Sequence, residues 1–391
     1  MVKLNKQLFI LFIFVLSLRL DAGVIKSTDY FSKIGEVASF QWAPQRYQSE
    51  FQYDIFYYIP RALENSQQVP ALIFNHGGGS STLTREGSIA TVNKYLPKMI
   101  EIAENLGIVL ILPSANGLNW GGHTRGLMRE LAELMKNHLN IDSDRIGLAG
   151  HSMGGMGITR SYSMLADEFS FFLPMGAGMD EAIQLEQHLN KVFNVPYVHL
   201  QGLKDHFEVF ITRCQEHLKR VAELEQKFSQ KSLFEMIFYD GNHQMDQQLT
   251  LDTLKRLFMR KRNLYQKTLF ATVNTISQKR TENEITFDLD SEPRYFWLEL
   301  SDIDLTNPET ISFFAQIRGN KIEINMPTYP QQSKELLIYL SHEMINLEDY
   351  VEIYLNGNLV KLREPSLPAA QVMDQRDPGF VFNDKLVISL H

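Results

Sequence analysis

The sequence has a single cysteine, Cys214, among 391 residues. One cysteine cannot form a disulfide within the chain, so the folded state must be stabilised by packing, even in an exported protein. Cys214 lies in the segment FITRCQEHLKRV, whose apolar residues have helical spacing. A thiol in such a setting is typically buried and inert, and we assign it no catalytic role.

The sequence also lacks an excess of basic residues. It has 38 Lys and Arg against 46 Asp and Glu, a formal charge of -8, so no basic field attracts phosphates and nucleic acid is excluded as a partner. It has no internal repeat, no low-complexity segment and no linker rich in Ser, Thr or Pro of the kind that tethers a binding module. With 44% apolar and 21% charged residues the composition is that of an ordinary globular protein, and its length predicts two domains or one large domain with an extension.

Long apolar runs are absent except near the start, where Lys3 and Lys6 precede an apolar stretch from Leu8 to Leu18. This stretch is shorter than the roughly 20 residues of a membrane span, and it is typical of a signal peptide. We predict a signal peptide over residues 1–22 with cleavage after Ala22, an uncleaved anchor being the alternative. The expected location is secreted or periplasmic, with no stable membrane span after cleavage.

From Phe51 to Met259 short apolar runs alternate with longer amphipathic ones. This alternation is typical of strands and crossover helices, so we predict an α/β fold with a mostly parallel sheet flanked by helices over residues 23–263. In such sheets the chemistry lies in loops beyond the carboxyl ends of the strands. The predicted strands are 51–59, 71–76, 108–114, 145–150, 169–178, 196–202 and 233–241.

After the basic stretch MRKRNLYQK the pattern changes to segments that alternate apolar and polar residues, as half-buried antiparallel strands do. Asn356 and Gly357 fit a two-residue hairpin turn, because both tolerate a positive φ. We therefore predict a second, small antiparallel β-sandwich domain over residues 264–391.

The pentapeptide Gly150-His151-Ser152-Met153-Gly154 is the clearest chemical signal. It follows a predicted strand and precedes a predicted helix, the setting of a nucleophile elbow, in which a sharp turn exposes the serine and glycines avoid collisions with nearby backbone. Ser152 is therefore the candidate nucleophile, and the backbone N–H of Met153 is a candidate donor to an oxyanion. A serine that merely caps the helix is the alternative.

Two later loops supply partners for Ser152, in the order serine, acid, histidine. Asp205 follows the strand PYVHLQG, and His243 follows the strand LFEMIFYDG, so we predict both as catalytic. Three residues compete with these: His206 beside the predicted acid, and Asp180 and Asp240 as alternative acids.

The segment NHGGG, residues 75–79, follows another predicted strand and can supply the second oxyanion donor. We predict the N–H of Gly78 for this role, with Gly77 as the alternative. Trp120 and His151 are candidate substrate contacts, although Trp120 could equally pack its loop and His151 could pack against the neighbouring loops. The scheme needs no metal and no cofactor.

The segments NHGGG, IDSDRIGLAGHSMGG, LKDHF and GNHQM together resemble the α/β-hydrolase superfamily. The likeness covers about residues 45–260 and is strongest to secreted esterases related to polyhydroxybutyrate depolymerases, feruloyl esterases and acetyl xylan esterases. The resemblance implies a triad of Ser152, Asp205 and His243. It also implies an oxyanion hole formed by Met153 with the loop at Gly77 and Gly78. The strand-rich part resembles, more loosely, a β-rich tail that follows such domains in some exported bacterial proteins.

The sequence thus predicts a secreted serine hydrolase that acts on carboxylic esters, with esters of polysaccharides, hydroxyacids or small acyl groups as substrates. A serine peptidase of the prolyl-oligopeptidase kind is the alternative, although such enzymes usually carry a propeller before the hydrolase domain. A non-catalytic exported binding protein is a further alternative. The acyl group, the alcohol and the oligomeric state stay open.

Overall fold

The computed structural model describes most of the chain, in segments separated by short gaps. The described residues are 23–44, 52–79, 82–117, 120, 124–178, 189–274, 278–282, 285–289, 294–303, 310–327, 333–365, 372–373 and 381–390. The predicted signal peptide and the alternative acid Asp180 lie outside them. No helix within the described segments is both long and apolar enough to cross a membrane.

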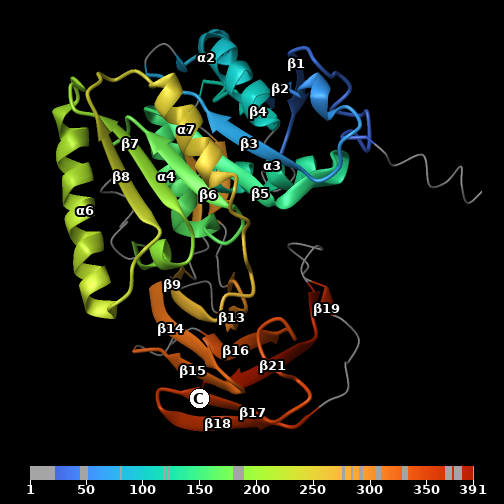
Figure 1. The fold of residues 1–391 in the computed structure, drawn as a ribbon, viewed down its shortest axis with the longest axis vertical. Coiled ribbons are helices and arrows are strands. Elements are labelled where there is room, and N and C mark those ends of the chain that lie inside the picture. Colours follow the sequence, from blue (N-terminus) through green and yellow to red (C-terminus); the bar gives the residue numbers. More distant parts are fainter. Residues whose placement is uncertain are drawn as a thin grey trace, which may run out of the picture.

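An eight-stranded sheet forms the centre of the first unit (Figure 1), in the order β1-β2-β4-β3-β5-β6-β7-β8. Its first two pairings are antiparallel and all later ones are parallel. The predicted α/β fold is confirmed, and the seven predicted strands correspond to β2–β8, whereas the edge strand β1 was not predicted. The strands are β1 (Ala38–Trp42), β2 (Tyr53–Tyr58), β3 (Val69–Asn75), β4 (Val109–Pro113), β5 (Ile141–His151), β6 (Phe171–Met175), β7 (Tyr197–Gly202) and β8 (Phe234–Tyr239).

Helices cover both faces of this sheet, which explains why the central strands are apolar runs without alternation. Strand β4, for example, has the sequence VLILP and is buried at all five positions. The helices α3 (Thr124–His138), α4 (Met153–Leu165) and α6 (Glu208–Phe228) contribute side chains to the apolar core on one face. The helices α2 (Arg85–Leu106) and α7 (Gln247–Leu257) do so on the other face.

Local sequence signals fix where the helices on the second face begin and end. Helix α2 begins after Thr84, whose hydroxyl accepts a hydrogen bond from the N–H of Gly87, and it ends at Gly107 with a φ of 61°. Helix α7 begins after Asp246, whose carboxylate accepts from the N–H of Leu249. These caps satisfy backbone groups that helix ends leave without partners.

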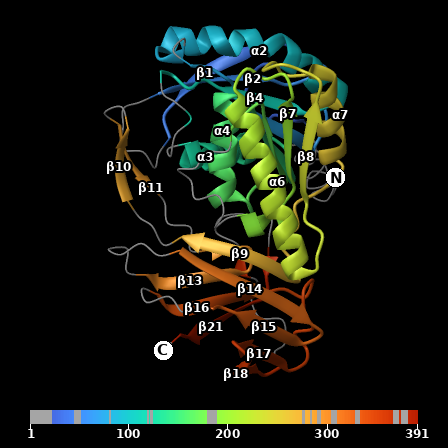
Figure 2. The same cartoon turned by 90° about the vertical axis from the view of Figure 1, so that its left-hand side faces the viewer.

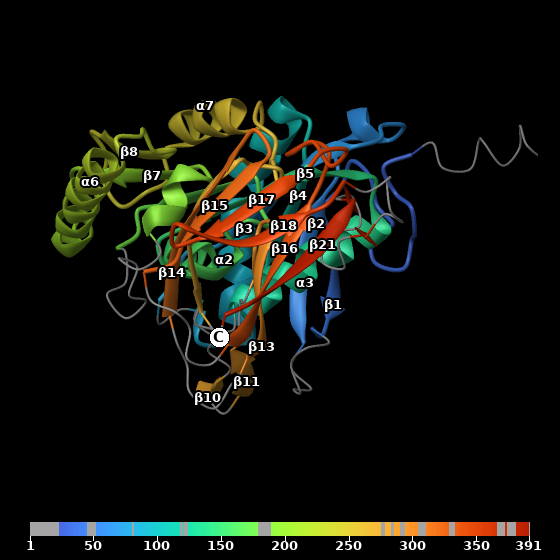
Figure 3. The same ribbon diagram turned by 90° about the horizontal axis from the view of Figure 1, so that it is seen from below.

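Most strands of the second unit lie below the first unit in Figures 1 and 2, and they face the viewer in Figure 3. It has a four-stranded sheet, β12-β13-β16-β21, and a five-stranded sheet, β18-β17-β15-β14-β9, with two further two-stranded pairs. The strands are β9 (Thr268–Asn274), β10 (Gln278–Glu282), β11 (Ile285–Leu289), β12 (Arg294–Tyr295), β13 (Leu298–Ile303), β14 (Thr310–Arg318), β15 (Lys321–Asn325), β16 (Ser333–Leu340), β17 (Val351–Leu355), β18 (Asn358–Arg363), β19 (Val372–Met373), β20 (Val381–Phe382) and β21 (Asp384–Ser389).

The prediction of purely antiparallel pairing in this unit is wrong for one pair, because β15 and β17 are parallel. The strand between them, β16, pairs in the four-stranded sheet. After this crossover the chain re-enters the five-stranded sheet, and β17 runs in the same direction as β15. The predicted hairpin between β17 and β18 is present, with φ values of 49° at Asn356 and 83° at Gly357.

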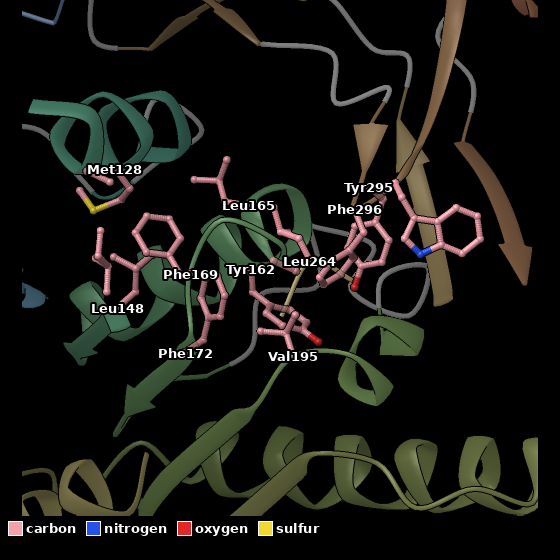
Figure 4. Close-up of a cluster of buried hydrophobic side chains, with 14 of the residues drawn as sticks. Met128, Leu148, Tyr162, Leu165, Phe169, Phe172, Val195, Leu264, Tyr295 and Phe296 are labelled. Atoms are coloured by element: carbon pink, nitrogen blue, oxygen red, sulfur yellow. The ribbon is translucent and has the colours of Figure 1, made fainter. Parts of the chain in front are cut away.

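The two units share one continuous apolar core (Figure 4), which extends from Met128 and Leu148 to Tyr295 and Phe296. Polar contacts accompany it, since the N–H of Phe296 donates to Asp167 at 2.9 Å. Further contacts are Phe270 N–H to Asn194 Oδ1 at 2.9 Å and Asn194 Nδ2 to Thr268 O at 2.7 Å.

We expect the shared core to make the two units unfold together. Phe296 is fully buried, so Phe296→Ala should lower the free energy of unfolding by about 3–5 kcal/mol, measured by urea denaturation. The matched control is Leu359→Ala, which truncates a side chain that is 54% exposed and should change stability by less than about 0.5 kcal/mol. Two separate transitions in the wild type, only one of them shifted by Phe296→Ala, would contradict the shared core.

Candidate active site

Ser152 occupies the turn between β5 and α4, with a φ of 54° and a ψ of −120°. This backbone conformation is strained for a residue with a side chain and persists only when its surroundings enforce it. The N–H of Ser152 donates to the carbonyl of Met175 at the end of β6, 2.8 Å away, which holds the turn against the sheet. The next residue, Met153, begins α4, so the serine lies at a helix N-terminus.

Close backbone approaches explain the glycines on either side of the serine. A Cβ atom on Gly150 would lie 2.7 Å from backbone atoms of Gly154, and one on Gly154 would lie 2.1 Å from the carbonyl oxygen of Asn75. Neither position has space for a side chain. The first turn of α4 therefore packs directly against the end of β3, where the NHGGG loop begins.

The structure brings the three predicted catalytic side chains together. His243 Nε2 is 2.8 Å from Ser152 Oγ, and His243 Nδ1 is 2.8 Å from Asp205 Oδ2. Because a carboxylate only accepts, the ring proton of a neutral His243 lies on Nδ1, and the lone pair on Nε2 faces the serine hydroxyl. This is the geometry in which a histidine can take the proton of a serine.

Asp205 is buried, and several donors stabilise its charge. Burial raises the pKa of its carboxyl, but hydrogen bonds from His243, the N–H of Phe207 and the Gln201 amide lower it, and the net pKa lies below the ordinary value. The Phe207 N–H is 2.9 Å from Oδ1, and Gln201 Nε2 is 3.0 Å from Oδ2. The sequence analysis missed Gln201, although its place at the end of β7, four residues before the acid, is a usable signal.

Asp240 and His206, two of the competing residues, form no hydrogen bond with the three catalytic candidates. Asp240 forms an ion pair with Lys204 at 2.7 Å, and both side chains are exposed. His206 Nδ1 is 3.8 Å from Asp205 Oδ1, beyond hydrogen-bond distance, and its side chain is 67% exposed.

His76 sets the orientation of the NHGGG loop. Its Nε2 accepts from the N–H of Ala115 at 2.9 Å, so its proton lies on Nδ1, which donates to the carbonyl of Gly77 at 2.6 Å. Burial lowers the pKa of His76 to about 4, so the ring is neutral at pH 7. In a trans peptide the N–H points away from the carbonyl, so the N–H of Gly78 is directed to the side opposite His76.

Trp120 and His151, the candidate substrate contacts, are both buried in the structure. Trp120 is fully buried, and its Nε1 donates to the carbonyl of His76 at 2.9 Å, so its position is that of the alternative, packing of the loop. His151 is 6% exposed, and both ring nitrogens are hydrogen-bonded within the protein. A sequence pattern cannot distinguish a residue that lines a pocket from one behind it.

The strand order, the strained serine between β5 and α4, and the chain order serine, aspartate, histidine together define an α/β-hydrolase fold. The predicted resemblance to this superfamily is therefore confirmed at the level of the fold. Among the described residues, no three His, Cys, Asp or Glu side chains are grouped so that they could hold a metal ion.

Comparisons with known proteins found similar solved structures but no matching family model and no matching curated protein. A thermostable esterase is 14% identical with a TM-score of 0.44, over 59% of this chain and 64% of that one. Dipeptidyl peptidase 4 of Porphyromonas gingivalis is 14% identical with a TM-score of 0.44, over 58% of this chain and 36% of that one. A ferulic acid esterase is 14% identical with a TM-score of 0.41, over 57% and 96%. The match thus spans less than two thirds of the first two proteins.

Three buried histidines should make stability depend on pH. Burial lowers the pKa of His76 and His151 to about 4 and that of His199 to about 3, against about 6.5 in an unfolded chain. Between pH 6.5 and 4 the unfolded state therefore binds more protons, and stability falls as the pH falls. Below about pH 6 the loss should approach roughly 1.4 kcal/mol per pH unit for each histidine, measured by urea denaturation from pH 7 to 5.

A variant without one of these histidines serves as the control. His199 lies on β7, with its Nε2 3.6 Å from the buried Cys214 thiol, whose own pKa is raised to about 12 by burial. His199→Leu should reduce the slope of stability against pH by about a third. An unchanged slope in this variant would contradict the assignment of neutral buried rings.

The close approach at the elbow gives a second prediction. Gly154→Ala forces a side chain into the backbone of Asn75 and should lower the free energy of unfolding by about 2 kcal/mol or more, measured by urea denaturation. Gly79→Ala is the matched control, because no atom lies within 4 Å of its Cβ position, and it should cost less than about 0.5 kcal/mol. Equal losses in the two variants would rule out the steric explanation.

Proposed function

We propose that this protein is a serine hydrolase that cleaves carboxylic esters through an acyl-enzyme. The observation that carries the proposal is the uninterrupted chain from Ser152 Oγ to His243 to Asp205, with both distances 2.8 Å, at a strained turn that opens a helix. A helix-capping serine is poorly supported, because the Ser152 side chain makes no capping hydrogen bond in α4.

In the proposed mechanism His243 takes the proton of Ser152 while Oγ attacks the ester carbonyl. The carbonyl oxygen becomes an oxyanion, which accepts hydrogen bonds from the N–H groups of Met153 and Gly78. Asp205 keeps the imidazole oriented and stabilises its positive charge. His243 then protonates the departing alcohol, and a water molecule, activated in the same way, releases the acid and restores the serine.

For substrates we propose esters of polysaccharides, hydroxyacids or small acyl groups, and for location the exterior of the cell or the periplasm. The support for the location is the signal peptide predicted over residues 1–22, in which two lysines precede an apolar stretch. Purified protein offered p-nitrophenyl esters of rising chain length, acetylated xylan, methyl ferulate and a peptide amide should hydrolyse at least one ester faster than the amide. A preference for the amide would favour a peptidase.

Replacement of the nucleophile tests the mechanism directly. Ser152→Ala should reduce kcat/KM for p-nitrophenyl acetate by on the order of a thousandfold or more and should abolish covalent labelling by a fluorophosphonate. Ser161→Ala removes another buried hydroxyl from the same helix, one that bonds the carbonyl of Gly157, and should leave activity and labelling unchanged. Turnover at the wild-type rate in Ser152→Ala would disprove the proposed nucleophile.

A further inference from the structure

His151 lies between the candidate nucleophile and the loop of the candidate base, and two hydrogen bonds hold its ring. Its Nε2 is 2.8 Å from the backbone carbonyl oxygen of His243, and its Nδ1 is 2.6 Å from the hydroxyl of Tyr95. Tyr95 belongs to α2 and is half-buried. Neither side chain has a part in the mechanism given above.

The directions of these hydrogen bonds follow from the groups involved. A carbonyl only accepts, so the proton of the His151 ring lies on Nε2. Burial lowers the pKa of His151 to about 4, so the ring carries no second proton at pH 7 and its Nδ1 must accept. The Tyr95 hydroxyl is then the donor, and it keeps its proton because burial raises its pKa to about 12.

Tyr95 and His151 also pack against the oxyanion loop. A Cβ on Gly77 would lie 2.6 Å from the Tyr95 hydroxyl oxygen and 3.2 Å from His151 Nδ1. It would also lie 3.1 Å from the backbone carbonyl oxygen of His151. Gly77 therefore has no space for a side chain, and the loop lies directly against this pair of residues.

We propose that Tyr95 and His151 are positioning residues that couple the oxyanion loop to the catalytic histidine, an inference that rests on the proposed function. The coupling runs from Gly77, which packs against the Tyr95 hydroxyl and the His151 ring, to the hydrogen bond between those two side chains. It continues from His151 Nε2–H to the backbone carbonyl of His243. It fixes the Gly77–Gly78 segment and the His243 backbone relative to each other. Small misplacements of reacting groups cost large factors in rate, so this alignment bears on the chemical step.

The test is Tyr95→Phe, which keeps the ring and removes the hydroxyl. His151 Nδ1 then loses its donor while buried, and Gly77 loses the hydroxyl against which it packs. We expect kcat for p-nitrophenyl acetate and the rate of fluorophosphonate labelling to fall by about tenfold or more, with KM changed by less than about threefold. The ratio of ester to thionoester hydrolysis should also fall, because sulfur accepts poorly from oxyanion-hole donors and a misaligned hole no longer favours oxygen.

Matched variants separate positioning from stability. Tyr58→Phe removes a buried hydroxyl that donates to Glu104 on the same helix, far along α2 from Tyr95, and should leave kcat and the ester to thionoester ratio unchanged. His151→Gln keeps an N–H donor for the His243 carbonyl and should retain more activity than His151→Leu. Free energies of unfolding of all four variants are measured by urea denaturation alongside the kinetics.

The outcomes distinguish this inference from the proposed function. Wild-type protein that neither hydrolyses esters nor reacts with the fluorophosphonate would remove the proposed function and the coupling with it. An active wild type with Tyr95→Phe within twofold of it, or with a loss matched by Tyr58→Phe, would overturn the coupling alone. A loss of activity in Tyr95→Phe at a constant ester to thionoester ratio would also overturn it, because the oxyanion loop would then be unaffected.

Discussion

The site depends on the contact between the first turn of α4 and the end of β3. With the Cβ position of Gly154 only 2.1 Å from the carbonyl oxygen of Asn75, the helix cannot move inward and a side chain cannot be inserted. This contact places the serine turn directly beside the loop that begins at His76. The two N–H groups proposed to bind the oxyanion come from opposite sides of it, Met153 from the helix and Gly78 from the loop. The contact between α4 and β3 therefore determines the distance between the two donors.

Helix α4 also connects the site to the second unit. The helix begins at the serine turn, and beyond its last residue Asp167 accepts a hydrogen bond from the N–H of Phe296. The contacts between the units involve residues that precede the amino ends of β6 and β7, namely Asp167 and Asn194. Ser152 and Asp205, in contrast, follow the carboxyl ends of β5 and β7. The second unit therefore supports the sheet and α4 from the end opposite the chemistry. Its buried, largely apolar contact is unlike that of a tethered module.

The parts of the site that could be predicted from the sequence depend on residues that are close together in the chain. The glycines at 150 and 154 and the positions of Asp205 and His243 after strands are local features, and the structure brings the three polar side chains together. The parts that could not be predicted depend on residues distant in the chain. Tyr95 and His151 are 56 residues apart, and nothing in either segment indicates their hydrogen bond. The parallel pairing of β15 and β17 and the burial of Trp120 were hidden for the same reason, because both are decided by packing between separate segments.

The charge states of the groups around His243 suit the charge that forms on it in the proposed mechanism. Its neighbour His151 is kept neutral by burial, and a positive charge on His243 further lowers the pKa of His151. Asp205 stays ionised, because its donors outweigh its burial. In the proposed mechanism a positive charge forms on His243, and the carboxylate of Asp205 is its negative partner. Neutral rings can still donate in fixed directions, so burial lets His76 and His151 orient the loops around the site without opposing the charge that the reaction creates.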